Sequence, residues 1–341
     1  MNAVAQPRPR TVAIVGATGA VGVEILKCLA KRNFPVAALR LFASARSAGK
    51  TLPFRGQQVA IETLTPKSFA GVDVALFSAG SGIAKEFAPH AVAAGAVVID
   101  NSSAFRMDER IPLVVPEINP ATIESHRGII ANPNCVAIIA CVPLWPIHKY
   151  NRIRRIIASS YQAASGAGAA AMGELRDSTQ AYLEGRAYEN KVLPHPYAFN
   201  LFCHNTAIDP ATGYNAEELK VIQETRKIFG DDSIAISITC VRVPVLRAHA
   251  IALTVECERP IAPSEVRTLF IGAPGVRLVD DQANNYFPMP KDASGQGDVL
   301  VGRIRQDLSD PTGKTLSLFV AGDQLLKGAA LNAVQIAEQL I

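Results

Sequence analysis

Cys135 is the strongest candidate nucleophile in the sequence. It follows the segment ANPN at residues 131–134 and precedes an uncharged run that continues to Trp145. Proline disfavours helical geometry in the residue before it, and the uncharged run is typical of a buried helix, so Cys135 is predicted to open that helix. Unpaired backbone N–H groups and the positive end of the helix dipole lower the pKa of a thiol placed there. The alternative is a small buried residue beside a core helix, and only partners elsewhere can decide between the two.

Two polar residues on predicted strands are candidate partners for this thiolate. Residues 233–243 and 248–257 alternate between apolar and polar side chains and are predicted to be strands. The alternation places Arg242 and His249 on the apolar faces of these strands. A buried guanidinium needs an anion, from the protein or from a ligand, and a histidine beside it is a candidate general base as well as a candidate structural residue.

A third cation follows a predicted strand of the N-terminal half. Residues 72–77 and 96–99 are predicted to be strands that flank a helix at residues 83–94. Alternating strands and helices of this kind indicate a parallel sheet, in which ligands bind beyond the carboxyl ends of the strands. Arg106 ends the loop at residues 100–106 and is therefore a candidate anion clamp, with an ordinary surface charge as the alternative.

A glycine-rich turn near the N-terminus indicates a dinucleotide site. Gly16, Gly19 and Gly22 have the spacing G-x-x-G-x-x-G, directly after the apolar run at residues 11–15 and before the amphipathic segment 23–31. Such glycines let backbone N–H groups approach a pyrophosphate at a helix N-terminus, whereas the alternative is a mere tight turn.

The second predicted strand, residues 37–42, bears on the choice of cofactor. An NAD site places a carboxylate near the end of this strand, but residues 43–50 read ASARSAGK. Hydroxyl groups and the cations Arg46 and Lys50 suit a 2′-phosphate, so NADP is favoured over NAD. A solvated polar loop is the alternative.

Length and composition limit the class of protein. The 341 residues suffice for two domains, and 19% charged residues with a net charge of +4 and no long basic cluster argue against nucleic-acid binding. The six cysteines show no C-x-x-C pairing, which favours a reducing cytosol, and no metal site is predicted. Residues 1–10 are predicted to be a disordered tail without a signal peptide, and prolines at 133, 143 and 146 argue against a membrane helix in the uncharged span 128–148.

The remaining segments complete an α/β prediction with two domains. A strand at residues 153–161 precedes the small-residue run 162–168 and a helix from about residue 169. A second helix is predicted from Asn215, with a capping box and a stop at Gly230, and the apolar spacing at residues 323–340 predicts a long final helix. We expect a Rossmann-like parallel-sheet domain (11–134 with 323–341, the final helix returning to it) and an α+β catalytic and dimerisation domain (135–322).

Together these motifs resemble the NADP-dependent aspartate-β-semialdehyde dehydrogenase family, from about Val12 to Ile341. The motifs that carry the resemblance are GATGAVG from Gly16, DNSSAFR ending at Arg106, NPNC ending at Cys135, YQAASGAG from Tyr161, EELK from Glu217, the run from Cys240 to His249, and KGAALNAVQIAE from Lys327. One departure is that Val136 and Ala137 stand where hydroxyl residues are common, which removes hydrogen bonds near the thiolate.

The resemblance implies a reaction and a set of roles. The reaction is reductive dephosphorylation of L-4-aspartyl phosphate by NADPH, in the biosynthesis of lysine, diaminopimelate, threonine, methionine and isoleucine, by a cytoplasmic homodimer or homotetramer. Cys135 would be the nucleophile, His249 the acid/base and Gln162 the group that orients the acyl intermediate. Arg242 would hold the substrate carboxylate and Glu217 its amino group, with Arg106 and Lys220 on the phosphate. NADP would contact Gly16, Thr18, Gly19, Ala20, Val21, Gly22, Arg46, Ser47, Ser165, Gly166 and Gln324.

Three rivals are weighed against this interpretation. The nearest is N-acetyl-γ-glutamyl-phosphate reductase, which performs the same chemistry, but the run from Arg242 to His249 and the NPNC box argue against it. A non-catalytic paralogue acting as a binding subunit would not need Cys135, Gln162, Arg242 and His249 together. A short-chain dehydrogenase would need a Tyr-x-x-x-Lys pair, which does not follow the predicted sheet.

Overall fold

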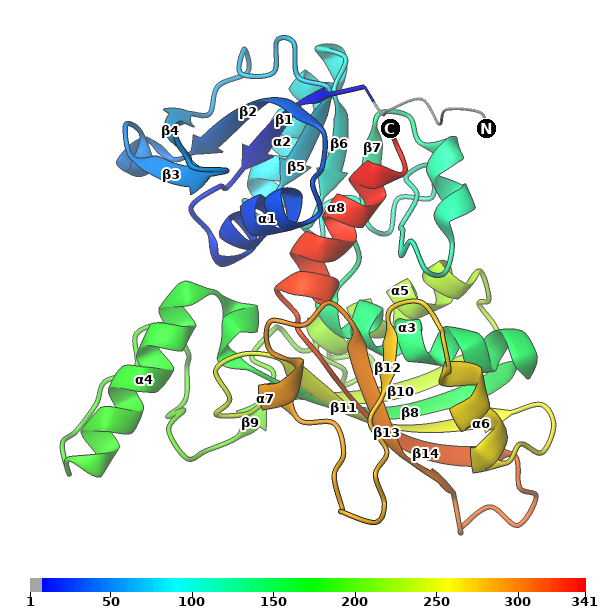
Figure 1. Ribbon diagram of the computed structural model, residues 1–341. Coiled ribbons are helices and arrows are strands. Elements are labelled where there is room, and N and C mark those ends of the chain that lie inside the picture. Colours follow the sequence, from blue (N-terminus) through cyan, green and yellow to red (C-terminus); the bar gives the residue numbers. More distant parts are fainter. Residues whose placement is uncertain (1–7) are drawn as a thin grey trace. The chain divides into compact units, whose positions relative to one another are not determined.

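The structure, a computed structural model, describes residues 8–341 and divides into two compact units (Figure 1). The first unit comprises the chain up to Pro133 together with Ala329–Ile341, and the second comprises Asn134–Gly328. Most of the expected N-terminal tail lies outside the described residues, but Arg10 already belongs to the first strand, and its guanidinium donates to the Leu340 carbonyl. None of the helices between residues 8 and 341 combines the length and apolar character needed to cross a membrane.

The first unit is built on a seven-stranded sheet in the order β3-β4-β2-β1-β5-β6-β7. All neighbouring strands pair in parallel except β3, which is antiparallel to β4. The strands are β1 Arg10–Val15, β2 Val36–Ala43, β3 Thr51–Phe54, β4 Gln57–Thr63, β5 Val74–Phe77, β6 Val97–Asp100 and β7 Ile129–Ala131. The helices are α1 Ala20–Lys31 and α2 Ser81–Ala93, with short 3₁₀ turns at Ala45–Ser47 and Pro120–Ser125. The parallel sheet predicted from the sequence is confirmed.

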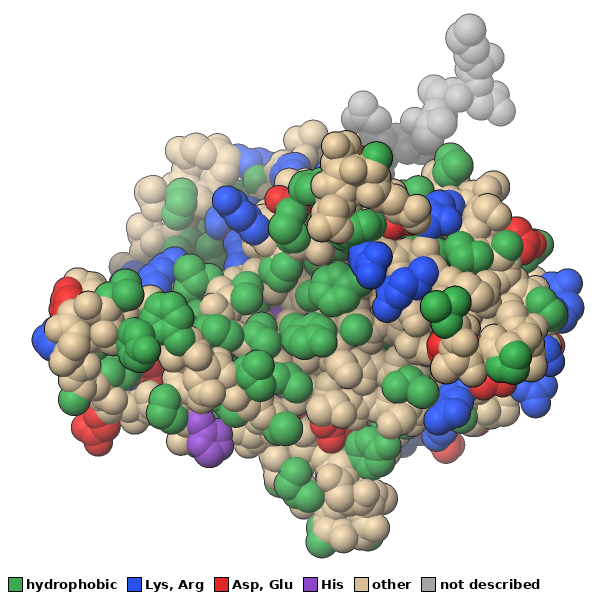
Figure 2. Space-filling model, turned by 90° about the horizontal axis from the view of Figure 1, so that it is seen from below, with side chains coloured by type: hydrophobic (Ala, Val, Ile, Leu, Met, Phe, Trp, Pro, Cys, Tyr) green, Lys and Arg blue, Asp and Glu red, His purple; other side chains and the backbone are tan. Residues whose placement is uncertain are grey.

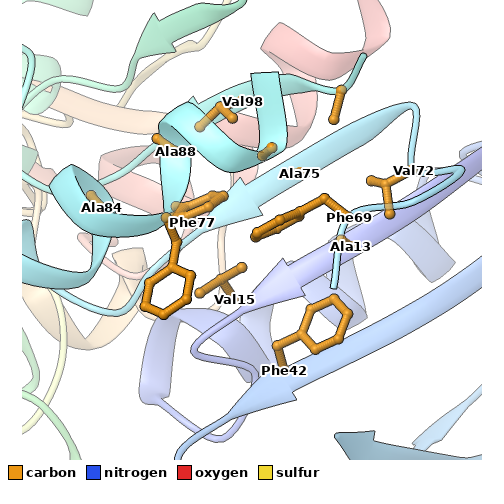
Figure 3. Close-up of a cluster of buried hydrophobic side chains, with 13 residues drawn as sticks. Ala13, Val15, Phe42, Phe69, Val72, Ala75, Phe77, Ala84, Ala88 and Val98 are labelled. Carbon is orange, nitrogen blue, oxygen red and sulfur yellow. The ribbon is translucent and has the colours of Figure 1, made fainter. Parts of the chain in front are cut away.

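A cluster of buried aromatic rings holds the strand ends of this sheet in place (Figure 3). Phe42 of β2, Phe77 of β5 and Phe69 pack together, and the Phe69 and Phe77 rings stack with centroids 5.8 Å apart. Such ring pairs contribute roughly 0.5–1.5 kcal/mol beyond the area that they bury. Ala84 and Ala88 of α2 close the cluster from the side of that helix. The loops at the carboxyl ends of β1, β2 and β5 are therefore anchored by a common core.

The C-terminal segment differs from its prediction. Instead of one helix over residues 323–340, strand β14 (Thr315–Gly322) is followed by a tight turn, a π-helical turn at Leu326–Ala330 and the short helix α8, Leu331–Glu338. The Asp323 carboxylate accepts the backbone N–H groups of Leu325 and Leu326, at 2.9 and 3.2 Å, and helical geometry begins at Leu326, three residues later than expected. The first unit takes up the chain again only from Ala329.

The second unit has its own seven-stranded sheet, in the order β12-β13-β14-β11-β8-β10-β9. Strand β8 lies between β10 and β11, parallel to β10 and antiparallel to β11, so β10 and β11 do not pair with each other although they are successive in the sequence. The remaining strands are β8 Ile153–Gln162, β9 Phe202–Cys203, β10 Ala235–Arg242, β11 His249–Cys257, β12 Val276–Leu278 and β13 Val299–Gln306. The helices are α3 Cys135–Tyr150, α4 Ala169–Leu183, α5 Ala216–Phe229, α6 Pro263–Phe270 and α7 Pro290–Ala293, with a 3₁₀ turn at Ala164–Ala167.

The two faces of this second sheet differ. Helix α3 packs on the sheet against β8, β11, β13 and β14, and α5 packs against β10, while α6 packs against α3, β12 and β13. The other face leaves Ile157 and Tyr161 of β8 exposed, beside Phe319 of β14. Figure 2 shows hydrophobic side chains gathered on the face of the molecule that is seen from below. The functional side chains described next belong to the covered face or to the strand ends.

Candidate active site

Cys135 is the first residue of α3, as predicted. The Asn134 side chain caps this helix, because its Oδ1 accepts the backbone N–H groups of Val136 at 2.8 Å and Ala137 at 3.3 Å. The helix is uncharged and buried from Val136 to Leu144, whereas Cys135 itself is half-buried. Tight packing fixes α3, and its N-terminus presents the cysteine at the edge of the unit's core. Val136 and Ala137 are fully buried.

Gly328 packs against Cys135. A Cβ atom at this glycine would lie 2.9 Å from the Cβ of Cys135, which is closer than real side chains approach. Gly328 belongs to the π-helical turn, a distortion that is common at functional sites. No role is predicted for this residue from the sequence, although a glycine inside an apolar helical pattern is a signal of close approach.

Four polar side chains around Asn134 form one network. Glu217 Oε1 accepts the Asn134 amide at 2.8 Å and the Gln162 amide at 3.4 Å, and its Oε2 lies 3.4 Å from the Lys220 ammonium. Burial acts to raise the pKa of Glu217, but nearby positive groups and the Asn134 hydrogen bond hold it below its ordinary value. Glu217 is therefore a buried carboxylate that is hydrogen-bonded to Asn134, the residue before Cys135.

The start of α5 positions Glu217 as the sequence predicts. Asn215 caps the helix, accepting the N–H groups of Glu217 and Glu218 at 3.0 Å each, while the Glu218 carboxylate accepts the Asn215 N–H at 2.9 Å. Gly230 ends the helix in the left-handed conformation with φ 65°. Because the capping box fixes the first turn, the direction of the Glu217 side chain follows from local sequence.

Arg242 lies on the buried face of β10, and the parity argument is confirmed. Its NH2 group donates to His204 Nε2 at 2.8 Å and its NH1 group to the Ala163 carbonyl at 3.4 Å. Its Nε atom is buried and has no hydrogen-bond partner among residues 8–341. A buried N–H group without an acceptor lowers the stability of the fold unless a ligand supplies the acceptor. Arg242 is therefore held in place on one side and open on the other.

His204, for which no role is predicted from the sequence, contacts Arg242. It follows the two-residue edge strand β9, and its backbone N–H donates to the Cys240 carbonyl at 2.8 Å. Burial, and then the charge of Arg242, lowers the pKa of His204 to about 4, so the ring is neutral and can accept the guanidinium N–H. No periodic pattern surrounds His204 in the sequence, and only the sheet order brings it to Arg242.

His249 opens β11 and is fully buried, as its strand parity predicts. Its Nδ1 atom accepts the backbone N–H of Ala163 at 2.9 Å, and Nε2 has no partner within the described chain. Burial first, and then the charge of Arg242, lowers the pKa of His249 to about 3. A Cβ atom at Gly166 would lie 3.0 Å from His249 Nε2 and 3.2 Å from Arg242 NH1. Gly166 therefore packs against both groups, and a side chain at this position would crowd them.

The residue before His249 adopts a strained conformation. Ala248 has φ 71°, a region that residues other than glycine rarely adopt and that typically costs about 1–3 kcal/mol. Its N–H donates to Gln324 Oε1 at 2.9 Å, and the Gln324 amide also donates to the Ser165 hydroxyl. Gln324 and Ser165, both predicted to contact a nucleotide, are therefore bonded to each other and support the backbone next to His249.

In the first unit, Arg106 lies beyond the carboxyl end of β6, as predicted. Its guanidinium is buried and donates to the carbonyls of Asn132 at 2.9 Å and Asn101 at 2.7 Å. Burial raises the pKa of the neighbouring Asp100, although hydrogen bonds from Ser102 and the charge of Arg106 oppose that shift. These carbonyl contacts fix the direction of the Arg106 side chain.

The glycine turn has the geometry expected for close approach of a ligand to the backbone. Gly16 has φ 85°, and a Cβ there would lie 2.5 Å from the Ser78 carbonyl, while a Cβ on Gly22 would collide with the Gly16 carbonyl. Gly19 caps α1 without a side-chain hydrogen bond, so the first N–H groups of the helix have no side-chain cap. Arg46, exposed, and Ser47, half-buried, lie in the 3₁₀ turn directly after β2. The turn fits a dinucleotide pyrophosphate.

No group of three or more histidine, cysteine, aspartate or glutamate side chains in residues 8–341 is arranged to hold a metal ion.

Comparison with known proteins places the whole chain beside one group of enzymes. Residues 11–126 match the family described as "Semialdehyde dehydrogenase, NAD binding domain", and residues 144–327 match "Semialdehyde dehydrogenase, dimerisation domain". The chain is 55% identical to aspartate-semialdehyde dehydrogenase of Synechocystis sp. over 335 residues, which are 98% of both chains. It is 48% identical to the protein of that name from Prochlorococcus marinus over 334 residues, 98% of this chain and 96% of the relative.

A solved structure agrees with these sequence matches. Aspartate semialdehyde dehydrogenase II of Vibrio cholerae, crystallised in complex with ASA, superposes with a TM-score of 0.95 at 44% identity and covers 98% of both chains.

Proposed function

The chain belongs to the aspartate-semialdehyde dehydrogenase family, and from this premise we propose that it interconverts L-4-aspartyl phosphate and L-aspartate 4-semialdehyde plus phosphate. In the biosynthetic direction the acyl phosphate is reduced with NADPH. The reaction serves the biosynthesis of lysine and diaminopimelate, threonine, methionine and isoleucine. The reaction type agrees with a thiol at a helix N-terminus beside buried cationic and amide groups.

One observation carries the substrate assignment. Two buried nitrogen atoms, Arg242 Nε and His249 Nε2, have no partner within residues 8–341, and Gly166 packs against both side chains. Aspartate semialdehyde brings a carboxylate and a carbonyl oxygen, which are acceptors of the kind that these atoms lack. We assign the α-carboxylate to Arg242 and the carbonyl oxygen to the neighbourhood of His249.

The remaining polar side chains complete the assignment. Glu217, which stays ionised, takes the substrate amino group, and Gln162, which bonds to Glu217, orients the acyl group. Arg106 and Lys220 bind the phosphate. The Cys135 thiolate attacks the acyl carbon, a C–S bond forms, the C–O bond to phosphate breaks, and a thioester remains. Bound NADPH supplies the hydride that reduces this thioester to the aldehyde.

The cofactor is a pyridine nucleotide, and we propose NADP. The backbone from Gly16 to Gly22 would hold the pyrophosphate, since the glycines permit a tight turn and α1 begins there. The 3₁₀ turn after β2 offers Arg46 and Ser47 to a 2′-phosphate and contains no carboxylate that would bind a ribose hydroxyl. Thr18, Ala20, Val21, Ser165, Gly166 and Gln324 are the further nucleotide contacts that we propose.

The match to a dimerisation domain supports oligomerisation, and we propose a homodimer or a dimer of dimers. The uncovered face of the second sheet supplies an apolar surface for it, through Ile157, Tyr161 and the neighbouring Phe319. Apolar patches of this kind, with the arginines Arg303 and Arg305 at their rim, are typical of protein–protein contacts.

A substrate-omission assay tests the proposed function. NADPH formation should require aspartate semialdehyde, phosphate and NADP together, and it should vanish in Cys135→Ala while NADP binding persists. Cys203→Ala is the matched control, because Cys203 is exposed, and it should retain turnover. Turnover without phosphate, or a faster reaction with N-acetyl-glutamate semialdehyde, would contradict the proposal.

A further inference from the structure

Helix α5 holds the residue before Cys135 at two points. Glu217 and Glu224 are separated by about two helical turns, so both side chains lie on one face of α5. The Glu217 Oε1 atom accepts the Asn134 side-chain amide at 2.8 Å, and the Glu224 Oε2 atom accepts the Asn134 backbone N–H at 2.5 Å. The proposed function uses Glu217 for the substrate amino group and assigns no role to Glu224.

Glu224 stands where an apolar residue would ordinarily be. It is 1% exposed and lies on the buried side of α5 with Val221 and Ile228. The buried stripe of an amphipathic helix is normally apolar, and a carboxylate there costs stability unless specific donors satisfy it. Stability alone does not call for a carboxylate at position 224, whereas the placement of a particular donor does. The donor in this case is the Asn134 backbone N–H.

Every polar group of Asn134 is engaged. Its N–H and its side-chain amide donate to the two glutamates, its Oδ1 atom caps the first turn of α3, and its carbonyl accepts the Ile138 N–H at 2.9 Å. The peptide between Asn134 and Cys135 is planar, so an Asn134 that is held at all these points also fixes the backbone of Cys135. Glu224 reaches the backbone of Asn134 from a second helix, and it therefore ties the start of α3 to α5.

We infer that Glu224 is a positioning residue for the reaction: by accepting the Asn134 N–H it fixes the start of α3 and holds the Cys135 sulfur where it attacks. This role rests on the proposed function for the identity of the electrophile. The effect on the Cys135 thiol does not, since any thiol reagent reports it. A misplacement of about 1 Å at a reacting atom can cost about a hundredfold in rate. The Asn134 N–H, which Glu224 occupies, is withdrawn from the substrate and does not serve as an oxyanion donor.

Two uncharged replacements isolate the hydrogen bond. Glu224→Gln and Glu224→Met both keep the length of the side chain and lose its charge, but only glutamine has an oxygen that can accept the Asn134 N–H. Glu224→Gln should retain at least about tenfold more kcat than Glu224→Met, because a misplaced thiolate attacks more slowly. The KM values for aspartate semialdehyde should agree within about threefold, since neither replacement touches Arg242 or Glu217. Equal kcat in the two variants, or a difference confined to KM, would overturn the inference.

Alkylation of Cys135 by iodoacetamide tests the same link without substrate or cofactor. The thiolate forms a C–S bond and displaces iodide, and peptide mapping separates Cys135 from the exposed Cys203. Loss of the Asn134 anchor loosens the first turn of α3, whose N–H groups and dipole stabilise a thiolate. Cys135 should therefore react about twofold to fivefold more slowly at pH 7 in Glu224→Met than in Glu224→Gln. Equal rates would overturn the inference, whereas a wild type without turnover of aspartate semialdehyde would contradict the proposed function alone.

Thr225→Val is the matched control for a general weakening of α5 against α3. Thr225 is buried like Glu224, but its hydroxyl accepts the Cys141 thiol at 3.6 Å and does not contact Asn134. Thr225→Val should keep the wild-type kcat, and a loss as large as that of Glu224→Met would overturn the inference. If Glu224→Met does not fold, Glu224→Asp decides, because it keeps the charge while its shorter side chain draws the oxygen away from the Asn134 N–H. Its kcat should fall below that of Glu224→Gln, and a kcat at or above that value would overturn the inference.

Discussion

Lowering the pH from 7 to 5 should destabilise the second unit, chiefly through His204 and His249. Burial, followed by the charge of Arg242, lowers the pKa of His204 to about 4 and of His249 to about 3, against 6.5 for an ordinary histidine. A group whose folded pKa lies below its unfolded value contributes fully above the unfolded pKa. It loses that contribution as the pH falls towards the folded pKa. Between these two pKa values the two histidines are protonated in the unfolded chain but remain neutral in the folded unit.

The magnitude follows from these pKa values. As the pH falls below 6.5, each histidine that stays neutral in the folded state lowers the free energy of unfolding by about 1.4 kcal/mol per pH unit. The step from pH 7 to pH 5 therefore removes about 2 kcal/mol for each histidine and about 4 kcal/mol for both. Carboxylates with a lowered pKa, such as Asp231 and Asp310, lose their contribution only as the pH falls below an ordinary value of 3.8. The interval from pH 7 to pH 5 therefore isolates the histidines.

Urea unfolding followed by tryptophan fluorescence measures this effect. Trp145 is the only tryptophan and lies in α3 of the second unit, so its emission reports on the unit that contains both histidines. In His204→Gln, which keeps an acceptor for Arg242, the loss between pH 7 and pH 5 should be smaller than in the wild type by about 2 kcal/mol. His195→Gln, at an exposed position, is the matched control and should follow the wild type. An unchanged pH dependence in His204→Gln would refute the reasoning.

Substitutions at four positions test the site itself. Arg242→Leu should lower kcat and raise KM for the semialdehyde, and Arg242→Lys should rescue little because a point charge cannot orient a carboxylate bidentately. Arg106→Leu should chiefly raise KM for phosphate. Steady-state kinetics with each substrate varied would show the reverse if the two anion sites were exchanged. Arg46→Ala should raise KM for NADP far more than KM for NAD, and an equal rise for both would mean that Arg46 supports the fold. Gly328→Ala forces a Cβ to within 2.9 Å of the Cys135 Cβ and should cost about 1–3 kcal/mol in stability or transition-state binding. Gly173→Ala, where the added Cβ meets open space, is the control and should keep wild-type turnover. Wild-type turnover and stability in Gly328→Ala would contradict the close packing of Gly328 on Cys135.

The parts of the site that depend on local sequence could be predicted. Pro133 and the uncharged run place Cys135 at the start of α3, and the capping box at Asn215 sets the first turn that carries Glu217. Strand parity puts Arg242 and His249 on buried faces, because alternation needs only the strand itself. The glycine turn and the parallel sheet of the first unit follow from motifs that span a few residues.

The parts that depend on pairing between distant segments could not be predicted. His204 reaches Arg242 only because the edge strand β9 pairs with β10, and two residues of strand leave no periodic signal. The Ala163 backbone N–H donates to His249 Nδ1, and nothing in the residue type of Ala163 indicates this contact. The apolar spacing of the C-terminal segment gives no sign of the turn at Asp323, whose carboxylate accepts the backbone N–H groups of Leu325 and Leu326 before the helical residues begin. Strands β3 and β4 are largely exposed, and neither has the long apolar run of a strand that is buried on both faces.

The most direct test of the central claim is the mass of the protein after incubation with L-4-aspartyl phosphate in the absence of NADPH. If Cys135 forms a thioester, intact-mass spectrometry will show the mass of one aspartyl group per chain, peptide mapping will locate it on Cys135, and an equal amount of phosphate will be released. The buried thiols of Cys141, Cys240 and Cys257 have pKa values raised to about 12, chiefly by burial, and should remain unmodified. Phosphate release without a covalent adduct, or an adduct on any other residue, would contradict the account.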